Sequence, residues 1–508
     1  MCIRDSYVTS NNGWAVAVQG SLVHVVWFDR RNATATNPWN FEIYYRHSID
    51  GGTTWVTDTR LTSDTARSYF PAVAVYQATV HVVWQDSRDG HFQTYYKRST
   101  NDGTTWSNDY RLASSGREQL TPSVSCSGDT VVVVWSESVA AGNYEVYAAR
   151  STDAGVTWAS VTQLSTSGHL AQFPSITVQP GAAYCTWQDN KSDPTKCRVY
   201  FRRFVGGSWQ TEQALSDQGS YYSLGPSVTS DGGSRVLVAW HDNRTNNAKW
   251  KIYSRLSNSS GGGFGNSDVL FSDTTCTYSE LPNVKMLGAD AYAVWSDNAG
   301  DNFEVKCNHS TDGGNKWLGA ERLTYAAGYS EYPSVAIGND ATHVVWQDER
   351  DGNYEIYYKR GYVMTPGWYT KLTSSPVQMN SNSWMVYSPA DNRLYELHND
   401  AGDPLTAYSI DNDNWTYVDS FQSMSGGACA CADDTGIVYV AKGGGPQFYT
   451  FKVATKTWTR VADLPGLSPF FYGKLGKVSC RSAAGGDEEH NGPLPRRLRM
   501  YEIPSAIA

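Results

Sequence analysis

Several features that mark common protein classes are missing from this sequence of 508 residues. No apolar run approaches the roughly 18 residues that a membrane-spanning helix needs, and no glycine-rich phosphate-binding loop stands between a predicted strand and a helix. The 41 Lys and Arg residues are outnumbered by 50 Asp and Glu, which gives a net charge of -9 and no basic stripe. We therefore expect no transmembrane segment, no nucleotide and no nucleic-acid partner.

Cysteine is also sparse and irregularly spaced. Nine are present, with no Cys-x-x-Cys pair and no His/Cys cluster at zinc spacing. We therefore expect no metal and no cofactor. Cys185 and Cys197 flank one predicted hairpin and could face each other as a disulfide, so the state of these two thiols stays open from sequence alone.

Aromatic residues and glycine are abundant instead, with 19 Trp, 33 Tyr and 45 Gly. This composition is typical of a turn-rich, all-β protein that is secreted, extracellular or displayed at a cell surface. Residues 1–13 are set apart as an artefact or partial start, because the opening letters MCIRDS resemble translated sequencing-library sequence. The natural N-terminus, with any signal peptide, is then expected to be missing.

A repeat of about 51 residues runs through residues 14–375. Its first marker is a proline that opens a short apolar stretch, as in PAVAV and PSVAI, at spacings of 51, 52, 52, 56 and 51 residues. These prolines are Pro71, Pro122, Pro174, Pro226, Pro282 and Pro333. An earlier copy reads WAVAV from Trp14, so we count seven units.

Each unit contains four predicted strands. The second strand ends in Trp-x-Asp or Trp-x-Glu, as in VHVVWQD to Asp86, and a strand such as EIYYR follows after a polar turn. Near-continuous apolar runs such as VVVVW, which ends at Trp135, predict sheets that are covered on both faces. Four-stranded antiparallel sheets repeated in this way predict an all-β fold, a seven-bladed β-propeller.

Between the third and fourth strands stands an octet of the form Ser-x-Asp-x-Gly-x-Thr-Trp, such as STDAGVTW at 151–158. Its Ser and Asp side chains can bond the amides of a tight turn, and its Gly allows a positive φ. The octet resembles the Asp-box of β-propellers in the sialidase superfamily, which implies a structural turn away from any active site. The residues assigned to it are Asp50, Gly52, Trp55, Asp102, Gly103, Trp106, Asp153, Gly155, Trp158, Asp312, Gly314 and Trp317.

The pattern changes after the seventh unit. Residues 380–473 hold two stretches that repeat at 43 to 44 residues, with Trp415 matching Trp458, and they resemble incomplete kelch repeats from a truncated second set of blades. Residues 474–508 lose the strand pattern and are expected to form a disordered or non-authentic tail. We infer that the sequence is part of a longer multidomain chain.

Arginines that follow the Trp-x-Asp marker are the first candidates for chemistry. The resemblance to sialidases implies three arginines that hold a substrate carboxylate, beside a Tyr nucleophile activated by Glu. The residues that would take these roles are Arg88, Arg244, Arg350, Tyr278, Glu280, Tyr329 and Glu331. However, these residues recur in register, which favours a structural role in each repeat, and the Phe-Arg-Ile-Pro signature of the family is absent.

Loop aromatics that depart from the repeat are the candidates for ligand contact. They are Trp39, Tyr221, Tyr222 and Trp250. We favour a non-catalytic binding module for a glycan or protein ligand. An exo-sialidase-like glycoside hydrolase is the first alternative, and a structural spacer in a larger surface protein is the second.

Overall fold

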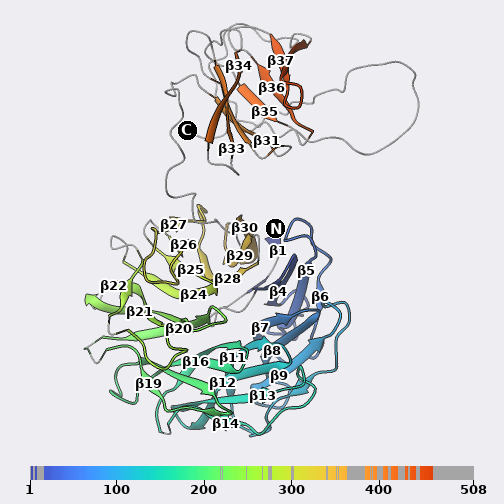
Figure 1. Ribbon diagram of the computed structural model, residues 1–508. Coiled ribbons are helices and arrows are strands. Elements are labelled where there is room, and N and C mark those ends of the chain that lie inside the picture. The colour runs from blue at the N-terminus through green and yellow to red at the C-terminus, as the bar shows by residue number, and fades with distance from the viewer. Residues whose placement is uncertain are drawn as a thin grey trace. The chain divides into compact units, whose positions relative to one another are not determined.

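The structure is a computed structural model that describes most of residues 16–362 and the strands within 384–461, together with Cys2–Ile3 and Ser6–Tyr7. Gaps in the first range fall at 167, 218, 220, 247–248, 266, 273–276, 299–301, 339–340, 351 and 353. The chain divides into two units, Met1–Val363 and Met364–Ala508. The described residues form strands and no helix, so none of their segments is a helix able to cross a membrane (Figure 1).

The described residues of the first unit form seven antiparallel sheets, numbered here in chain order. Sheet 1 comprises β3 (Val16–Gln19), β4 (Leu22–Asp29), β5 (Glu42–Ser48) and β6 (Thr59–Arg60). Sheet 2 comprises β7 (Ser68–Tyr76), β8 (Thr79–Asp86), β9 (Gln93–Ser99) and β10 (Tyr110–Arg111). Sheet 3 comprises β11 (Gln119–Ser127), β12 (Thr130–Ala140), β13 (Asn143–Ser151) and β14 (Thr162–Gln163). Sheet 4 comprises β15 (Gln172–Gln179), β16 (Ala182–Asp189), β17 (Arg198–Val205), β18 (Ser208–Trp209) and β19 (Gln213–Ala214). Sheet 5 comprises β20 (Ser223–Ser230), β21 (Val236–Asn246), β22 (Lys249–Ser257) and β23 (Val269–Leu270). Sheet 6 comprises β24 (Ser279–Leu287), β25 (Asp290–Asp297), β26 (Glu304–Ser310) and β27 (Glu321–Arg322). Sheet 7 comprises β28 (Ser330–Ile337), β29 (Ala341–Asp348) and β30 (Glu355–Tyr362).

Two short segments near the chain start join these sheets. β1 (Cys2–Ile3) pairs with β30 as the outermost strand of sheet 7, and β2 (Ser6–Tyr7) pairs with β4 of sheet 1. These residues are predicted from the sequence to lie outside the fold, whereas in the structure they pair with the last and first sheets. Their origin as library sequence stays a prediction.

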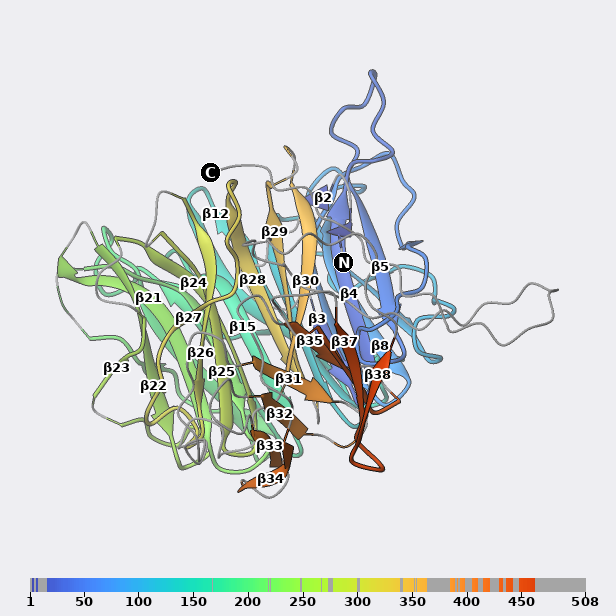
Figure 2. The same ribbon diagram turned by 90° about the horizontal axis from the view of Figure 1, so that it is seen from above.

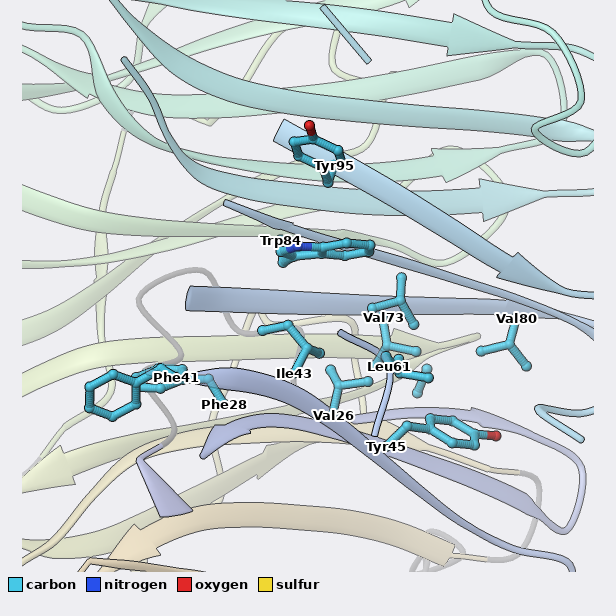
Figure 3. Packing of buried hydrophobic residues seen from close by; sticks show 12 residues of the cluster. Val26, Phe28, Phe41, Ile43, Tyr45, Leu61, Val73, Val80, Trp84 and Tyr95 are labelled. Atoms are coloured by element: carbon cyan, nitrogen blue, oxygen red, sulfur yellow. The ribbon is translucent and has the colours of Figure 1, made fainter. Parts of the chain in front are cut away.

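Neighbouring sheets are held together by buried aliphatic and aromatic side chains. Between sheets 1 and 2, Val26 and Ile43 belong to one cluster with Val73 and Trp84 (Figure 3). Similar clusters fill each later junction. One more joins sheet 1 to sheet 7 around Trp27, and Figure 2 shows β30 beside β4. The apolar second strands are therefore buried on both faces, as their sequence predicts.

The residue before each of the six repeat prolines has a left-handed backbone, within or beside a β-bulge of the first strand. Tyr332, for example, has a φ of 53°, which bulky residues rarely adopt. Its N–H donates to Ser296 Oγ of the preceding sheet over 3.0 Å, and the Thr121 N–H donates to Gln85 Oε1 over 2.9 Å. In these sheets the middle residue of Trp-x-Asp therefore binds the next sheet.

The octets make the turn bonds that their residues predict. In 151–158, Ser151 Oγ accepts from the Gly155 N–H over 2.9 Å, and Asp153 Oδ1 accepts from the Thr157 N–H over 2.8 Å. Both contacts join residues four positions apart, so they close the turn without help from any other strand. The octet is thus a local structure that the chain forms from its own eight residues.

One octet residue is assigned wrongly from the sequence. In the octet at 99–106, Asn101 rather than Asp102 holds the turn, because Asn101 Oδ1 accepts from the Thr105 N–H over 2.9 Å. Asp102 is the following residue, with a φ of 56°, and its N–H donates to the carbonyl oxygen of Ala78 over 2.9 Å. An amide oxygen can replace the carboxylate here because the turn requires only an acceptor.

The octets also contact the sheet that precedes them. The Gly155 backbone passes so close to Tyr96 of sheet 2 that a Cβ at position 155 would lie 1.9 Å from Tyr96 Oη. The same hydroxyl bonds His81 Nδ1 over 2.7 Å. Equivalent pairs in sheets 1 and 7 are His24–Tyr45 and His343–Tyr358. The octet glycine is therefore required by the space between two sheets as well as by its φ.

Cys185 and Cys197 do not form a disulfide; both thiols are free and buried. The strand register explains this, because Cys185 is opposite Arg202 whereas Cys197 stands one residue before β17. Burial raises the pKa of the Cys197 thiol to about 11, so this thiol is protonated at neutral pH.

The second unit contains two four-stranded antiparallel sheets in its described residues. They comprise β31 (Trp384–Ser388), β32 (Arg393–Leu397), β33 (Pro404–Ser409) and β34 (Asn414–Ser420); and β35 (Cys429–Ala432), β36 (Ile437–Ala441), β37 (Phe448–Lys452) and β38 (Thr457–Val461). Tyr395, Val440 and Phe451 belong to one buried cluster that the two sheets share. The kelch-like assignment stays a prediction, and residues 474–508 lie outside the described residues.

Candidate functional site

The predicted site residues lie at or just after the ends of the second strands, or at and around the starts of the first and third strands. There, the arginine two positions past Trp-x-Asp folds back onto its own aspartate. Arg88 Nε donates to Asp86 Oδ1 over 2.9 Å, Nη2 donates to Oδ2 over 2.7 Å, and Nη1 donates to Asp109 over 2.6 Å. The guanidinium lies 4.5 Å from the centroid of the Tyr95 ring, and Trp84 Nε1 donates to Asp86 over 2.8 Å.

Arg244 and Arg350 are held in the same way. Arg244 Nε donates to both oxygens of Asp242, and its Nη1 donates to Asp268 over 2.5 Å. Arg350 Nε donates to Asp348 over 2.7 Å. Burial raises the pKa of Asp242, although the bonds and charge of Arg244 oppose that shift. Each of the three predicted arginines is thus bonded within its own sheet.

Removal of one of these guanidinium groups is expected to destabilise the fold. Asp86 is buried, so Arg88→Gln deprives a buried carboxylate of its charged donors and should lower the free energy of unfolding by about 2 kcal/mol, measured by urea denaturation. Arg111→Gln is the matched control, because its 2.9 Å pair with Asp89 is surface-exposed and should contribute less than about 1 kcal/mol. Equal losses in the two variants would contradict a structural role for Arg88.

Five aromatic side chains of sheets 5, 6 and 7 form an aromatic row: Tyr222, Trp250, Tyr278, Phe303 and Tyr329. Ring centroids lie 6.4 Å apart for Tyr222 and Trp250, 6.4 Å for Tyr278 and Phe303, and 6.3 Å for Phe303 and Tyr329. A backbone bridge connects Trp250 to Tyr278. The three tyrosines are exposed. The aromatic row therefore joins residues predicted to bind a ligand with residues predicted for catalysis.

Phe303 is the member of the aromatic row that the sequence analysis missed. It directly precedes β26, as Trp250 stands just before the buried Lys251 of β22. Phe41 and Phe92 occupy the same place before β5 and β9. An aromatic residue at this fixed place in most units, although sheet 4 has Cys197 there, is the signal that could have identified Phe303.

Two tyrosines of the aromatic row, Tyr278 and Tyr329, are each followed two residues later by a glutamate. Glu280 and Glu331 are partly buried on the first strands of sheets 6 and 7. Burial and then the charge of Glu331 raise the pKa of Glu280, while burial and then the charge of Glu349 raise the pKa of Glu331. The tyrosine hydroxyls and these carboxylates can exchange hydrogen bonds with a polar ligand.

Tyr221 and Trp39 are the remaining predicted contact residues. Tyr221 is partly buried, and the guanidinium of Arg244 lies 5.0 Å from its ring centroid. Trp39 is 55% exposed in the segment after β4, with the Arg67 guanidinium 5.9 Å from its ring centroid. Tyr221 therefore supports the Arg244 contacts, whereas Trp39 lies between β4 and β5 and outside the aromatic row.

No group of three or more His, Cys, Asp or Glu side chains in the described part of the chain is arranged to hold a metal ion. The groups present at the site are aromatic ring faces, hydroxyl groups and two carboxylates. Such groups suit non-covalent recognition of a polar ligand.

No known protein family matches this sequence, and no curated protein matches it significantly. Solved structures share parts of the fold at low identity. A Hadza microbial sialidase is 12% identical, covering 63% of this chain and 74% of its own, with a TM-score of 0.41. A polysaccharide lyase acting as an ulvan lyase is 10% identical (70% and 93% covered, TM-score 0.47), and Penicillium chrysogenum α-L-arabinanase is 12% identical (58% and 93%, TM-score 0.41).

Proposed function

We propose that residues 14–375 form a seven-bladed β-propeller of the Asp-box type that binds a glycan non-covalently through the aromatic row. The order of the buried clusters supports a ring, because each sheet packs on the next and sheet 7 also packs on sheet 1. A propeller buries both faces of every four-stranded sheet in this manner. The seven sheets are then the seven blades of the proposed ring.

The aromatic row is the observation that carries the proposal. Tyrosine and tryptophan combine an apolar ring face with a polar group, so they can pack on the C–H face of a sugar and bond its hydroxyl groups. Tyr278 and Tyr329 present such faces on adjacent sheets. Glu280 and Glu331 add acceptors that could orient the sugar hydroxyls.

A non-catalytic role is supported by the state of the arginines. A sialidase mechanism needs three arginines that are free to hold a substrate carboxylate. Arg88, Arg244 and Arg350 each donate instead to an aspartate of their own sheet. An exo-sialidase-like activity and a spacer role therefore rank behind glycan binding. The aromatic-rich, glycine-rich composition favours a secreted or cell-surface location.

A glycan array followed by calorimetry on the best ligand tests the proposal. Tyr278→Ala should weaken binding about tenfold, equivalent to about 1.4 kcal/mol, with the fold intact by circular dichroism. Tyr76→Ala is the control, since Tyr76 is 39% exposed against 37% for Tyr278 but lies at the far end of its first strand.

Three outcomes would contradict glycan binding through the aromatic row. An array without any bound glycan would favour the spacer or a protein ligand. Equal losses for Tyr278→Ala and Tyr76→Ala would place the ligand elsewhere. Turnover of a fluorogenic sialoside, which we do not expect, would favour the enzyme.

A further inference from the structure

One position of the repeat carries a buried acid in most sheets of the first unit. It is the third-strand residue that pairs with the acid at the end of the Trp-x-Asp or Trp-x-Glu marker. Sheets 1, 3, 6 and 7 have Glu42, Glu145, Glu304 and Glu355 at this position. In sheet 1, the Thr62 hydroxyl of the fourth-strand segment donates to the Glu42 carboxylate over 2.5 Å. In sheet 3, the Ser165 hydroxyl donates to Glu145 in the same way. The carboxylate is thus the acceptor that the surrounding donors require.

Sheet 4 reverses the charge at this position, which is held by Arg198. Arg198 is only 4% exposed, and an arginine stays protonated in a protein. Its Nη2 donates to the carbonyl oxygen of Gly219 over 3.0 Å. Its Nε and Nη1 are buried and have no hydrogen-bond partner in the part of the chain that the structure describes. A buried cation with two unpaired donors is costly, because each lost hydrogen bond to a charged group destabilises the fold.

Two serines that bond the backbone of the residues flanking Arg198 also have hydroxyl groups without an acceptor within the described residues. Ser216 Oγ accepts from the Val199 N–H over 3.0 Å, as Thr62 accepts from Ile43 in sheet 1. The glutamate to which the Ser216 hydroxyl would donate is absent from sheet 4. Ser223 is fully buried with an unpaired Oγ, and its N–H donates to the carbonyl oxygen of Cys197, the residue before Arg198.

The nearby carboxylates do not pair with Arg198. Asp189 is opposite Arg198 in the strand pair; its Oδ1 accepts from the Lys191 N–H over 2.9 Å, and its buried Oδ2 has no hydrogen-bond partner among the described residues. Both oxygens of Asp242 on sheet 5 accept from Arg244. Asp193, in the loop before β17, accepts two bonds from Thr195. None of these acids forms an ion pair with Arg198 among the described residues.

We propose that a small inorganic anion of the halide class binds at the junction of sheets 4 and 5, in the place that glutamate carboxylates occupy in sheets 1, 3, 6 and 7. It would accept from Nε and Nη1 of Arg198 and from the hydroxyls of Ser216 and Ser223. Charge-assisted bonds from a guanidinium are among the strongest available to an anion. Because Arg198 is nearly completely buried, a monatomic anion fits this site better than a sulfate ion or the carboxylate of a sugar.

Thermal unfolding at constant ionic strength tests this site, with sodium chloride replaced by sodium gluconate. Chloride should raise the midpoint for the wild-type chain by about 3 °C, because an anion that binds only the folded state stabilises it. Arg198→Glu, which introduces the residue found at this position in sheets 1, 3, 6 and 7, should abolish the chloride dependence. Arg202→Met on the same strand should retain it, since Arg202 donates to the carbonyl oxygens of Gln210 and Leu164.

A chloride effect that persists in Arg198→Glu, or is lost in Arg202→Met, would overturn the proposal. Crystals of the wild-type chain soaked in sodium bromide give a second readout that depends on no variant. An anomalous peak beside the Arg198 guanidinium is the expected result. A water molecule at that position in bromide would also overturn the proposal.

Discussion

Replacing Gly155 by alanine is expected to lower the free energy of unfolding by roughly 3–5 kcal/mol. Gly155 has a φ of 79°, which an alanine adopts only at a cost, and the new Cβ would lie 1.9 Å from Tyr96 Oη. The tyrosine cannot withdraw easily, because its ring is buried and its hydroxyl is bonded to His81. The junction between sheets 2 and 3 must therefore open.

Gly128→Ala separates the two causes of this loss. Gly128 also has a left-handed backbone, with a φ of 58°, but a Cβ added at this position would meet no described atom within 4 Å. Its substitution by alanine should therefore lower the free energy of unfolding only by the cost of the left-handed backbone, roughly 1–2 kcal/mol. Urea denaturation of both variants supplies the measurement. If the two losses were equal, the contact between the octet and the preceding sheet would be unimportant for stability.

Mild acid is expected to destabilise the first unit through three buried histidines, His24, His81 and His241. Burial lowers the pKa of each from the ordinary value of 6.5 to about 3, with small further contributions from His47 at His24 and from Arg98 at His81. The unfolded chain therefore binds more protons than the folded one between these values, so stability falls as the pH falls. Each histidine should remove roughly 2 kcal/mol between pH 6.5 and 5.

Unfolding free energies measured across pH 7 to 5 check this expectation. His81→Gln should flatten the pH dependence, although it also perturbs the bond to Tyr96 and lowers stability at neutral pH. His91→Gln is the control, because the His91 side chain is 56% exposed. Carboxylates with raised pKa values, such as Glu42, oppose the histidines at lower pH, so the measurement stops at pH 5. An unchanged slope in His81→Gln would contradict the assignment.

The sequence predicts most residues of the candidate site but not their arrangement. Tyr222, Trp250, Tyr278 and Tyr329 are selected as separate candidates for binding or catalysis, and the structure arranges them in one row with Phe303. The row spans three units of the repeat, so no single motif contains it. The spacing of Cys185 and Cys197 in the sequence likewise leaves their strand register open, and a disulfide between them depends on that register.

The amino-acid sequence by itself determines the four-stranded unit, the buried tryptophans and the octet turns. These features depend on residues within one unit, and in the octet on bonds between residues four positions apart. Only the tertiary structure decides which side chains meet across sheets, such as Tyr96 at Gly155, and which donors stay unpaired among the described residues, such as those of Arg198. Tyr96 and Gly155 are about 60 positions apart in the sequence, so their contact depends on how the sheets stack.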